Sequence, residues 1–512
     1  MKKFPVLLVL LVAIVASSCS RKVPEIVHNI PDHAFLVTSL HPKQIYDKGQ
    51  IGTMDIFTKK IRNKIVLSLV KDPLQSGIDI SEYMFIFVYF IDDQPVIGTT
   101  AVIKDSDKFA STIGNLLKDN EGQVIDHKGY SMVTPEDEEL AIAWNEKQVI
   151  FLSSPQKNFT AEEWQTELVS LYDLSREEAV TSIVDFNKFT GKMKDFNVWF
   201  TGDELKKIME KTNAFKEMQF ELPMELYNNY GQVFVDFSDG AMYVHSETHF
   251  SDDVTKAAES FLVAKESLNK DLLKLTPGNN LILAMAFSVE LDKMVKMMKN
   301  FGGTQMDSVS GKIEKATGVS GDVMLEAMSG DFVLAINGSP EGASIPVEIL
   351  IGIGLDDETL QDKLMGTVNN MAQVEKDGDF FMINVNGMEL YSGIVNGIWV
   401  ITNVSGYKSA VTGSGLEKTL SESKFNDYAG GSMGMYMNLD LTTYPSSLQG
   451  MMAQGGMPGM LELVAESMSY IGIEGSNYEN DITVKTSKEK ENSLYTLLQL
   501  MEKAAEGKAW SE

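Results

Sequence analysis

Short hydrophobic runs of β-strand character recur along the chain, with turn-forming residues and amphipathic segments between them. Within 231–250, Phe234 and Asp236 alternate with Val233 and Val235, a period of two that predicts a sheet with one buried and one solvent-facing side. Turn-forming residues separate successive runs at 92–93, 238–240, 377–378 and 396–397. Because such short connections favour antiparallel pairing, and helices are expected between the hairpins, the pattern predicts the α+β class.

Helical periodicity follows the strands at matching places in the two halves. Amphipathic segments run over 107–117 and 358–371, and each comes after an extended run that opens at Pro95 or Pro346. Asp105 and Asp356 close those runs, so we expect both to be helix N-caps.

The internal similarity predicts that one module occurs twice. At an offset of 250, the stretch 124–133 matches 374–383 and aligns Met132 with Met382. Strand-turn-strand patterns at 231–250 and 470–487 follow in the same order, and each is followed by a helical pattern, near 255–266 and 490–503. We therefore expect two tandem copies of a mainly antiparallel sheet-plus-helix module, at 24–270 and 271–512.

The first 18 residues have the pattern of a signal peptide. Two lysines precede an almost wholly apolar stretch, 4–16, and small residues follow it. This stretch is shorter than the ~20 residues that a membrane-spanning helix needs. Cys19 comes next and is the only cysteine in the chain, so it cannot form an internal disulfide. Its position at the cleavage site indicates a modification of the sulfur.

Residues 16–19, Ala-Ser-Ser-Cys, resemble the lipobox of bacterial lipoproteins. The resemblance implies that the mature protein begins at Cys19, with 19–23 as a tether carrying acyl chains such as palmitate. Since each buried methylene contributes ~0.8 kcal/mol, two or more chains hold a protein on a membrane. Ser20, in place of an aspartate, implies the outer membrane, and a first acidic residue at Glu25 favours its periplasmic face. The alternative is a plain signal peptide cleaved near Ser18.

Charge and composition narrow the possible partners. The 512 residues include 72 acidic and 44 basic side chains, a net charge of -28, which disfavours nucleic-acid binding. Hydrophobic residues make up 44% of the chain and rule out wholesale disorder.

The search for catalytic chemistry gives one weak candidate. The chain has no His-Glu-x-x-His or EF-hand motif, and we expect a non-enzymatic protein without a cofactor. His245, Glu247 and His249 alternate along one predicted strand and suggest a metal-dependent hydrolase as the alternative. Because the outer two positions are about 13 Å apart along a strand, one ion cannot join all three without a bulge. A solvent-facing strand side is therefore favoured.

Methionine is the other unusual feature, with 29 residues, many of them between 430 and 460. The pattern predicts a helix after Pro445, a hinge at Gly455-Gly456 and a second helix opening at Pro458. These methionines suit a core or an adaptable contact surface, with a partner or lipid groove and a Cu(I) site as the alternatives.

The order of these features is similar to a family. A lipobox, the stretch 29–34 before a strand, 76–81 (Ser-Gly-Ile-Asp-Ile-Ser) before an aromatic strand, and the duplicated halves resemble domain-of-unknown-function lipoproteins common in Bacteroides-type bacteria. The resemblance implies location and architecture and brings no catalytic residues. We therefore expect a non-enzymatic, outer-membrane-anchored periplasmic binding or scaffold protein. The alternatives are a hydrolase using His245 and His249, or a carrier of an apolar ligand between the two repeats.

Overall fold

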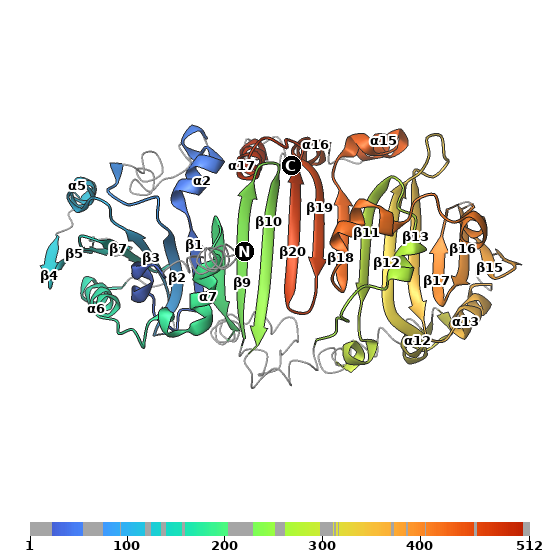
Figure 1. Ribbon diagram of the computed structural model, residues 1–512, viewed down its shortest axis with the longest axis horizontal. Helices are drawn as coiled ribbons and strands as arrows, with labels where there is room; N and C mark the ends of the chain where they lie inside the picture. The colour runs from blue at the N-terminus through green and yellow to red at the C-terminus, as the bar shows by residue number, and fades with distance from the viewer. Residues whose placement is uncertain are drawn as a thin grey trace, which may run out of the picture. The chain divides into compact units, whose positions relative to one another are not determined.

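The computed structural model describes two compact units. Unit 1 comprises Met1–Leu205 with Tyr230–Asp236, and unit 2 comprises Lys206–Asn229 with Phe237–Glu512 (Figure 1). The described residues are 23–54, 75–92, 94–117, 124–134, 140–155, 159–202, 229–250, 262–296, 311, 314–315, 317–369, 373–385, 388–404, 406–454 and 458–504. Antiparallel strands and helices make up both units, which confirms the α+β class.

Unit 1 is built on a sheet in which each ladder is antiparallel. Its order is β4-β5-β6-β7-β3-β2-β1-β8-β9. The strands are β1 (Leu36–Leu40), β2 (Met84–Ile91), β3 (Gln94–Val102), β4 (Ile125–His127), β5 (Tyr130–Val133), β6 (Leu140–Trp144), β7 (Gln148–Ser153), β8 (Phe196–Thr201) and β9 (Asn229–Ser238).

Helices cover both sides of this sheet. The helices of unit 1 are α2 (Pro42–Gly49), α5 (Ser106–Leu117), α6 (Ala161–Tyr172) and α7 (Val184–Lys192). On one side, Trp164 of α6 and Phe186 of α7 join a large aromatic core with Phe87 and Trp199 from the strands. On the other, Phe109 of α5 belongs to a smaller core over β3, β6 and β7.

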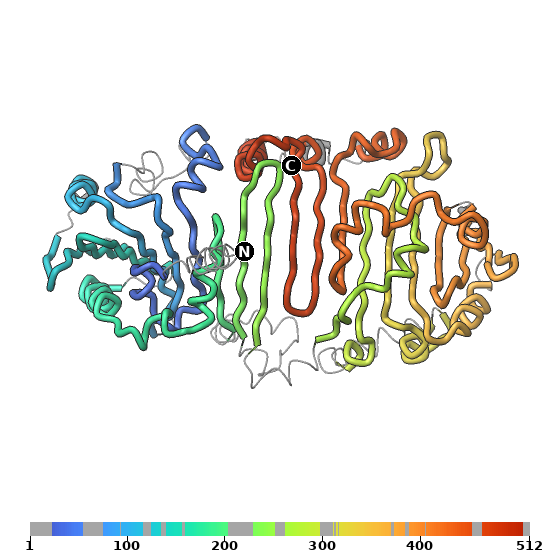
Figure 2. The backbone as a smooth tube through the Cα atoms, viewed as in Figure 1, coloured from blue at the N-terminus to red at the C-terminus, as the bar shows by residue number. Residues whose placement is uncertain are grey.

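Unit 2 contains a longer antiparallel sheet, in the order β10-β20-β19-β18-β11-β12-β13-β17-β16-β15-β14. Neighbouring strands β10, β20, β19 and β18 are easily followed in Figure 2. The strands are β10 (Ala241–Phe250), β11 (Leu281–Ser288), β12 (Met328–Gly338), β13 (Val347–Leu355), β14 (Gln373–Asp377), β15 (Phe380–Val385), β16 (Met388–Val395), β17 (Ile398–Thr402), β18 (Met433–Asn438), β19 (Met468–Gly475) and β20 (Glu479–Thr486).

Two separate cores hold the elements of unit 2 together. The helices are α10 (Lys270–Lys274), α12 (Gly321–Ala327), α13 (Thr359–Val368), α14 (Tyr407–Ser409), α15 (Ser446–Gln454), α16 (Pro458–Ser467) and α17 (Ser493–Lys503). Leu272 of α10 and Phe425, from the short helical turns after α14, pack on one side of the sheet against Ala286 and Ala335. Leu360 of α13 packs with Trp399 in the other core.

Nine strands follow the same order in the two units. In unit 1 the spatial order is β4-β5-β6-β7-β3-β2-β1-β8-β9, and in unit 2 it is β14-β15-β16-β17-β13-β12-β11-β18-β19. Each strand of unit 1 thus corresponds to the strand of unit 2 whose number is higher by ten. Met132 and Met382 occupy the second strand of each series. This agreement is what a duplication requires, and the duplication with boundaries at 24–270 and 271–512 stays a prediction.

Turn residues explain the hairpins. Asn396 and Gly397 both have positive φ angles, 52° and 74°, as a two-residue hairpin turn between β16 and β17 requires. Gly378 (φ 62°) and Asp92 (φ 46°) occupy the turns that the sequence predicted between β14 and β15 and between β2 and β3.

One predicted helix cap is correct and one is wrong. The backbone N–H of Lys108 donates to Oδ1 of Asp105 at 3.0 Å, so Asp105 caps α5. In α13 the backbone N–H of Thr359 donates to Asp357 at 2.9 Å instead of Asp356, because that helix begins later than the sequence pattern suggested. The predicted helix at 255–266 is not formed in its described part, 262–266, and the rest lies outside the described residues.

Candidate functional site

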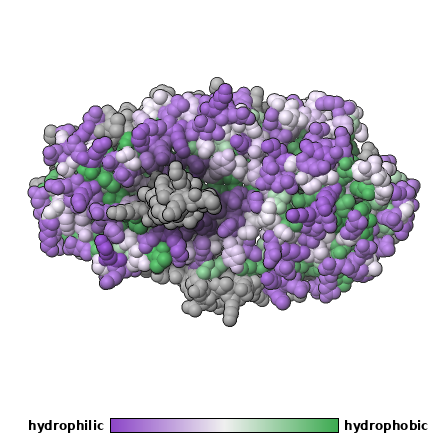
Figure 3. Space-filling model, in the orientation of Figure 1, coloured by the Kyte–Doolittle hydropathy of each residue, from purple (hydrophilic) through white to green (hydrophobic). Residues whose placement is uncertain are grey.

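The predicted lipidation site, Cys19, lies outside the described residues, so its modification stays a prediction. Among the helices that the structure describes, none combines the length and hydropathy needed to cross a membrane. Hydrophilic residues occupy much of the surface in view in Figure 3, as the acidic composition leads one to expect.

The histidine strand predicted from the sequence is β10, and its side chains form a chain of contacts. Nε2 of His245 lies 2.9 Å from Oε1 of Glu247, and Nε2 of His249 lies 3.1 Å from Oε2 of the same carboxylate. Nδ1 of His245 lies 2.8 Å from Oδ1 of Asp481 on β20. The Glu247 side chain, 9% exposed, therefore sits between two half-buried imidazoles.

This arrangement does not supply a metal site. The ladder between β10 and β20 runs without a bulge from Ala241 to Glu247, so the two imidazoles are held on opposite sides of the carboxylate. Within the described ranges, no group of three histidine, cysteine or acidic side chains is placed to hold a metal ion. The predicted hydrolase thus gains no ligand set from these residues.

Electrostatics at this cluster favour a charged His245. Burial lowers the pKa of His245, but hydrogen bonds and charges from Asp481 and Glu247 outweigh that effect, and the pKa is raised. On β19, Glu474 is the direct cross-strand partner of Asp481. Burial and the charge of Asp481 raise the pKa of Glu474. An open cleft of about 380 Å³ adjoins the cluster, lined by Glu247, Thr248, His249, Phe250, Tyr478 and Glu479.

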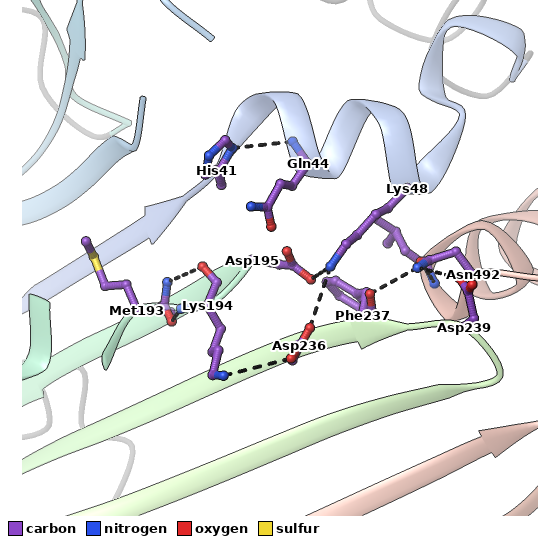
Figure 4. Close-up of polar contacts among 12 residues, drawn as sticks. His41, Gln44, Lys48, Met193, Lys194, Asp195, Asp236, Phe237, Asp239 and Asn492 are labelled. Atoms are coloured by element: carbon purple, nitrogen blue, oxygen red, sulfur yellow. Dashed lines mark hydrogen bonds and ion pairs between the residues drawn. The ribbon is translucent and has the colours of Figure 1, made fainter. Parts of the chain in front are cut away.

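A second polar cluster lies in unit 1 and is structural. Lys48 projects from α2 toward two carboxylates, with Nζ 2.5 Å from Asp195 and 3.6 Å from Asp236 (Figure 4). The Asp195 side chain is 2% exposed, and Lys194 adds a longer ion pair, 4.0 Å, to Asp236. These contacts join α2 to the start of β8 and to β9, so the cluster holds elements of the unit together.

The methionine-rich segment folds largely as its pattern predicts. Helices α15 and α16 cover Ser446–Gln454 and Pro458–Ser467, and the glycines between them lie outside the described residues. Met451 is 60% exposed, so it is not a core residue. Met433, Met435 and Met437 point to one side of β18, the strand beside β11.

Met433, Met435 and Met437 belong to a continuous apolar surface. Cross-strand pairing places one apolar residue on each of eight neighbouring strands, and we call this set the apolar row: Val244, Ile482, Ile473, Met435, Met285, Leu334, Ile351 and Ile401. Shorter apolar rows flank it on both sides. One contains Met433, Phe287, Phe332 and Ile353, and the other Met437, Leu283, Ile336 and Ile349.

The middle of this surface is open to solvent. Met285, Phe287, Ile349 and Met433 are 38%, 36%, 38% and 43% exposed, and none of them belongs to either core of unit 2. An antiparallel sheet with a solvated side normally carries polar residues there. Unit 2 thus has the predicted solvent-facing side, but apolar residues occupy it. The nearly unbroken hydrophobic sequences of β11 and β13 indicate such a surface, because apolar residues occupy both sides of each strand.

Comparison with protein families and solved structures supplies the context. A family model described as a domain of unknown function, DUF4836, matches residues 29–494. The chain belongs to the DUF4836 family. The predicted resemblance to an uncharacterised family is confirmed at that level, while the lipoprotein character stays a prediction. No curated protein matches the DUF4836 chain by sequence.

Solved structures resemble this DUF4836 protein weakly. Crystal form III of TP0453 has a TM-score of 0.29 and 7% identity, with 49% of this chain and 91% of that chain covered. Crystal form I gives a TM-score of 0.26 at 7% identity, with 49% and 90% covered. DNA polymerase III subunit beta from Borrelia burgdorferi gives 0.08 at 8% identity, with 71% and 98% covered. Values this low do not establish a shared fold or function.

Proposed function

We propose that this DUF4836 protein is a non-enzymatic binding or scaffold protein, anchored to the outer membrane by acyl chains on Cys19 and facing the periplasm. The open apolar surface of unit 2 carries the binding role, because large exposed apolar patches on soluble domains mark contact sites. The anchor rests on the sequence: an apolar leader, small residues and a single cysteine at the cleavage position.

The apolar-ligand carrier is a second candidate. The apolar row favours it, because a surface without polar side chains suits a hydrocarbon ligand. This version places the ligand on unit 2 alone, whereas the sequence suggested a site between two repeats. The metal-dependent hydrolase is not proposed, because Glu247 separates the imidazoles of His245 and His249.

Replacing Cys19 with Ala tests the anchor. We expect the variant to be exported without acyl chains and to leave the membrane fraction, whereas the parent chain stays there. Metabolic labelling with a fatty-acid analogue measures the modification directly. A Cys19→Ala chain that still fractionates with membranes through acyl chains would contradict the proposal. Cleavage of the protein by protease added to intact cells would contradict the periplasmic face.

A further inference from the structure

The apolar surface of unit 2 offers no hydrogen bonds to a ligand. Neither the apolar row nor its flanking positions on β18, β11, β12 and β13 carry a nitrogen or oxygen in a side chain. Trp399, which pairs with Ile353 at the β17 margin, donates its Nε1–H to Ser392. Each of these four strands has a neighbour on both sides, so the ladders use their backbone groups. An occupant is therefore held by burial of hydrocarbon and by van der Waals contact.

Charge disfavours two of the possible occupants. A protein face that binds an anionic bilayer carries lysine and arginine around its apolar part, whereas the positions that flank the apolar row on β18, β11, β12 and β13 are apolar as well. A second copy of the chain would bring its own net charge of -28 to the contact. A small ligand with an uncharged tail needs no basic residues around the apolar surface and is not repelled by the acidic chain.

The apolar row is long enough to hold a lipid tail along part of its length, and its side chains suit one. Ile401 on β17 packs against the core that contains Leu360 and Trp399. The rest of the apolar row crosses seven strands spaced about 4.8 Å apart, a length of roughly 29 Å. Half the hydrocarbon core of a bilayer, which one tail spans, is about 15 Å. Methionine supplies Met285, Met433, Met435 and Met437, and its flexible thioether adapts to a mobile chain better than branched side chains do.

We propose that the apolar row of unit 2 and its flanking positions bind the long alkyl tail of a single lipid molecule and leave its polar headgroup in water. This inference rests on the proposed function, of which it names the ligand. The proposed occupant is a monomeric lipid. The test below also distinguishes it from three other occupants: a bilayer surface, a second copy of the chain and an amphipathic helix.

The test measures binding of a fluorescent lysophosphatidylcholine with one long saturated chain, below its micelle concentration. The protein is the full mature chain with Cys19→Ser, so that no acyl chain of its own competes. The test variant is Met285→Gln with Met433→Gln, which keeps side-chain length and adds polar groups to the surface. Tyr243→Gln and Met451→Gln are matched controls, because these residues are 44% and 60% exposed outside the apolar rows.

We expect saturable binding that weakens roughly tenfold or more in the double variant, because a polar group must be desolvated on each strand. The controls should bind as the parent does, with unchanged melting temperatures. If the double variant melts early, Ile349→Thr alone provides the same comparison, since threonine suits strands. Equal binding by parent and variant overturns the proposal.

Three other results also overturn it: binding to anionic vesicles, a dimer in solution, or capture of an amphipathic helical peptide, if Met285→Gln with Met433→Gln abolishes that interaction and leaves lysolipid binding intact. The assay does not use the membrane anchor. Loss of anchoring with intact lysolipid binding therefore contradicts the location alone, and the reverse result contradicts the ligand alone.

Discussion

The two units share a strand order, but β2 and its counterpart β12 place their large side chains on opposite sides of the sheet. In unit 1, Phe85, Phe87 and Tyr89 of β2 point into the helix-covered core and are at most 1% exposed. In unit 2, the covered side of β12 carries Val333 and Ala335, and the larger Phe332 and Leu334 point to the open side. The side chains that would fill a core are thus placed where water reaches them.

The comparable surface of unit 1 is also less continuous. Its middle row across the strands reads Phe151, Thr99, Ile86, Thr38, Val198 and Val233, so threonines interrupt it. None of these residues is among the strongly exposed hydrophobic side chains. Similar strand pairing therefore does not require an open apolar side, and its presence in unit 2 is the feature on which the proposed binding role rests.

The largest expected effect distinguishes a covered from an open aromatic residue. Trp199→Ala removes a side chain that is 1% exposed and packs against Phe186 and Phe189, so we expect a loss of about 3–5 kcal/mol in unfolding free energy. Phe287→Ala, at a 36% exposed site, should cost about 1 kcal/mol or less. Hydrogen exchange in urea reports on each unit separately. Equal losses would contradict the difference between the two surfaces.

The ion pair in unit 1 gives the next effect. Lys48→Met leaves the carboxylate of Asp195, 2% exposed, without this cation, and we expect a loss of about 1–3 kcal/mol from unit 1. Lys43→Met, which breaks an exposed pair with Asp47 on the same helix, should cost about 0–0.5 kcal/mol. Chemical denaturation measures both. A Lys48 variant as stable as the Lys43 variant would show that the buried pair does not stabilise α2.

Small residues on the covered side of unit 2 can be tested by adding one methyl group. A Cβ at Gly472 would lie 2.1 Å from the ring of Tyr428, so Gly472→Ala should destabilise unit 2 by about 1–3 kcal/mol. Gly114 of α5 has no atom within 4 Å of such a Cβ, and Gly114→Ala should stabilise unit 1 by about 0.4–1 kcal/mol. Thermal melts should show a lower melting temperature for Gly472→Ala and a higher one for Gly114→Ala. Stabilisation by Gly472→Ala would mean that Tyr428 does not cover the sheet there.

The smallest effect depends on pH. The folded state raises the pKa of His245 above its ordinary value of 6.5, so its charge stabilises unit 2 fully below pH 6.5. This contribution is lost as the pH rises through the folded pKa. His245→Gln should therefore lower the melting temperature most below pH 6.5, with a difference that shrinks at higher pH. Asp481→Asn, which removes a bonded carboxylate, should reduce that pH dependence, and a difference that grows with pH would contradict the assignment.

The sequence predicted several strands and hairpins and the helices α5, α13, α15, α16 and α17, because these follow local rules. Alternation in 231–250 and the Asn396-Gly397 turn directly specify β9, β10 and the β16–β17 hairpin. The cap at Asp356 was wrong because α13 begins at Thr359, so Glu358 is the N-cap residue and the N–H of Thr359 donates to Asp357. The open surface could not be predicted in this way, since periodicity assigns residues to sides of a strand without showing which side a helix covers.

The candidate residues divide in the same way. Periodicity placed His245, Glu247 and His249 on one side of a strand, as observed, but the contacts with Asp481 depend on pairing across 236 residues of chain. Met435 lies in the methionine-rich segment that the sequence showed. Its place in the apolar row depends on β18 pairing with β11 and β19, which no local pattern specifies.

Oxidation of individual methionines in the folded protein tests most directly whether unit 2 has an open apolar surface that takes a lipid tail. Met285 and Met433, 38% and 43% exposed, should oxidise far faster than the buried Met132, which is 2% exposed. Adding lysophosphatidylcholine should slow oxidation of Met285 and Met433 while leaving Met451 unchanged. Protection of Met285 and Met433 to the level of Met132 without lipid, or no change when lipid is added, would contradict the account.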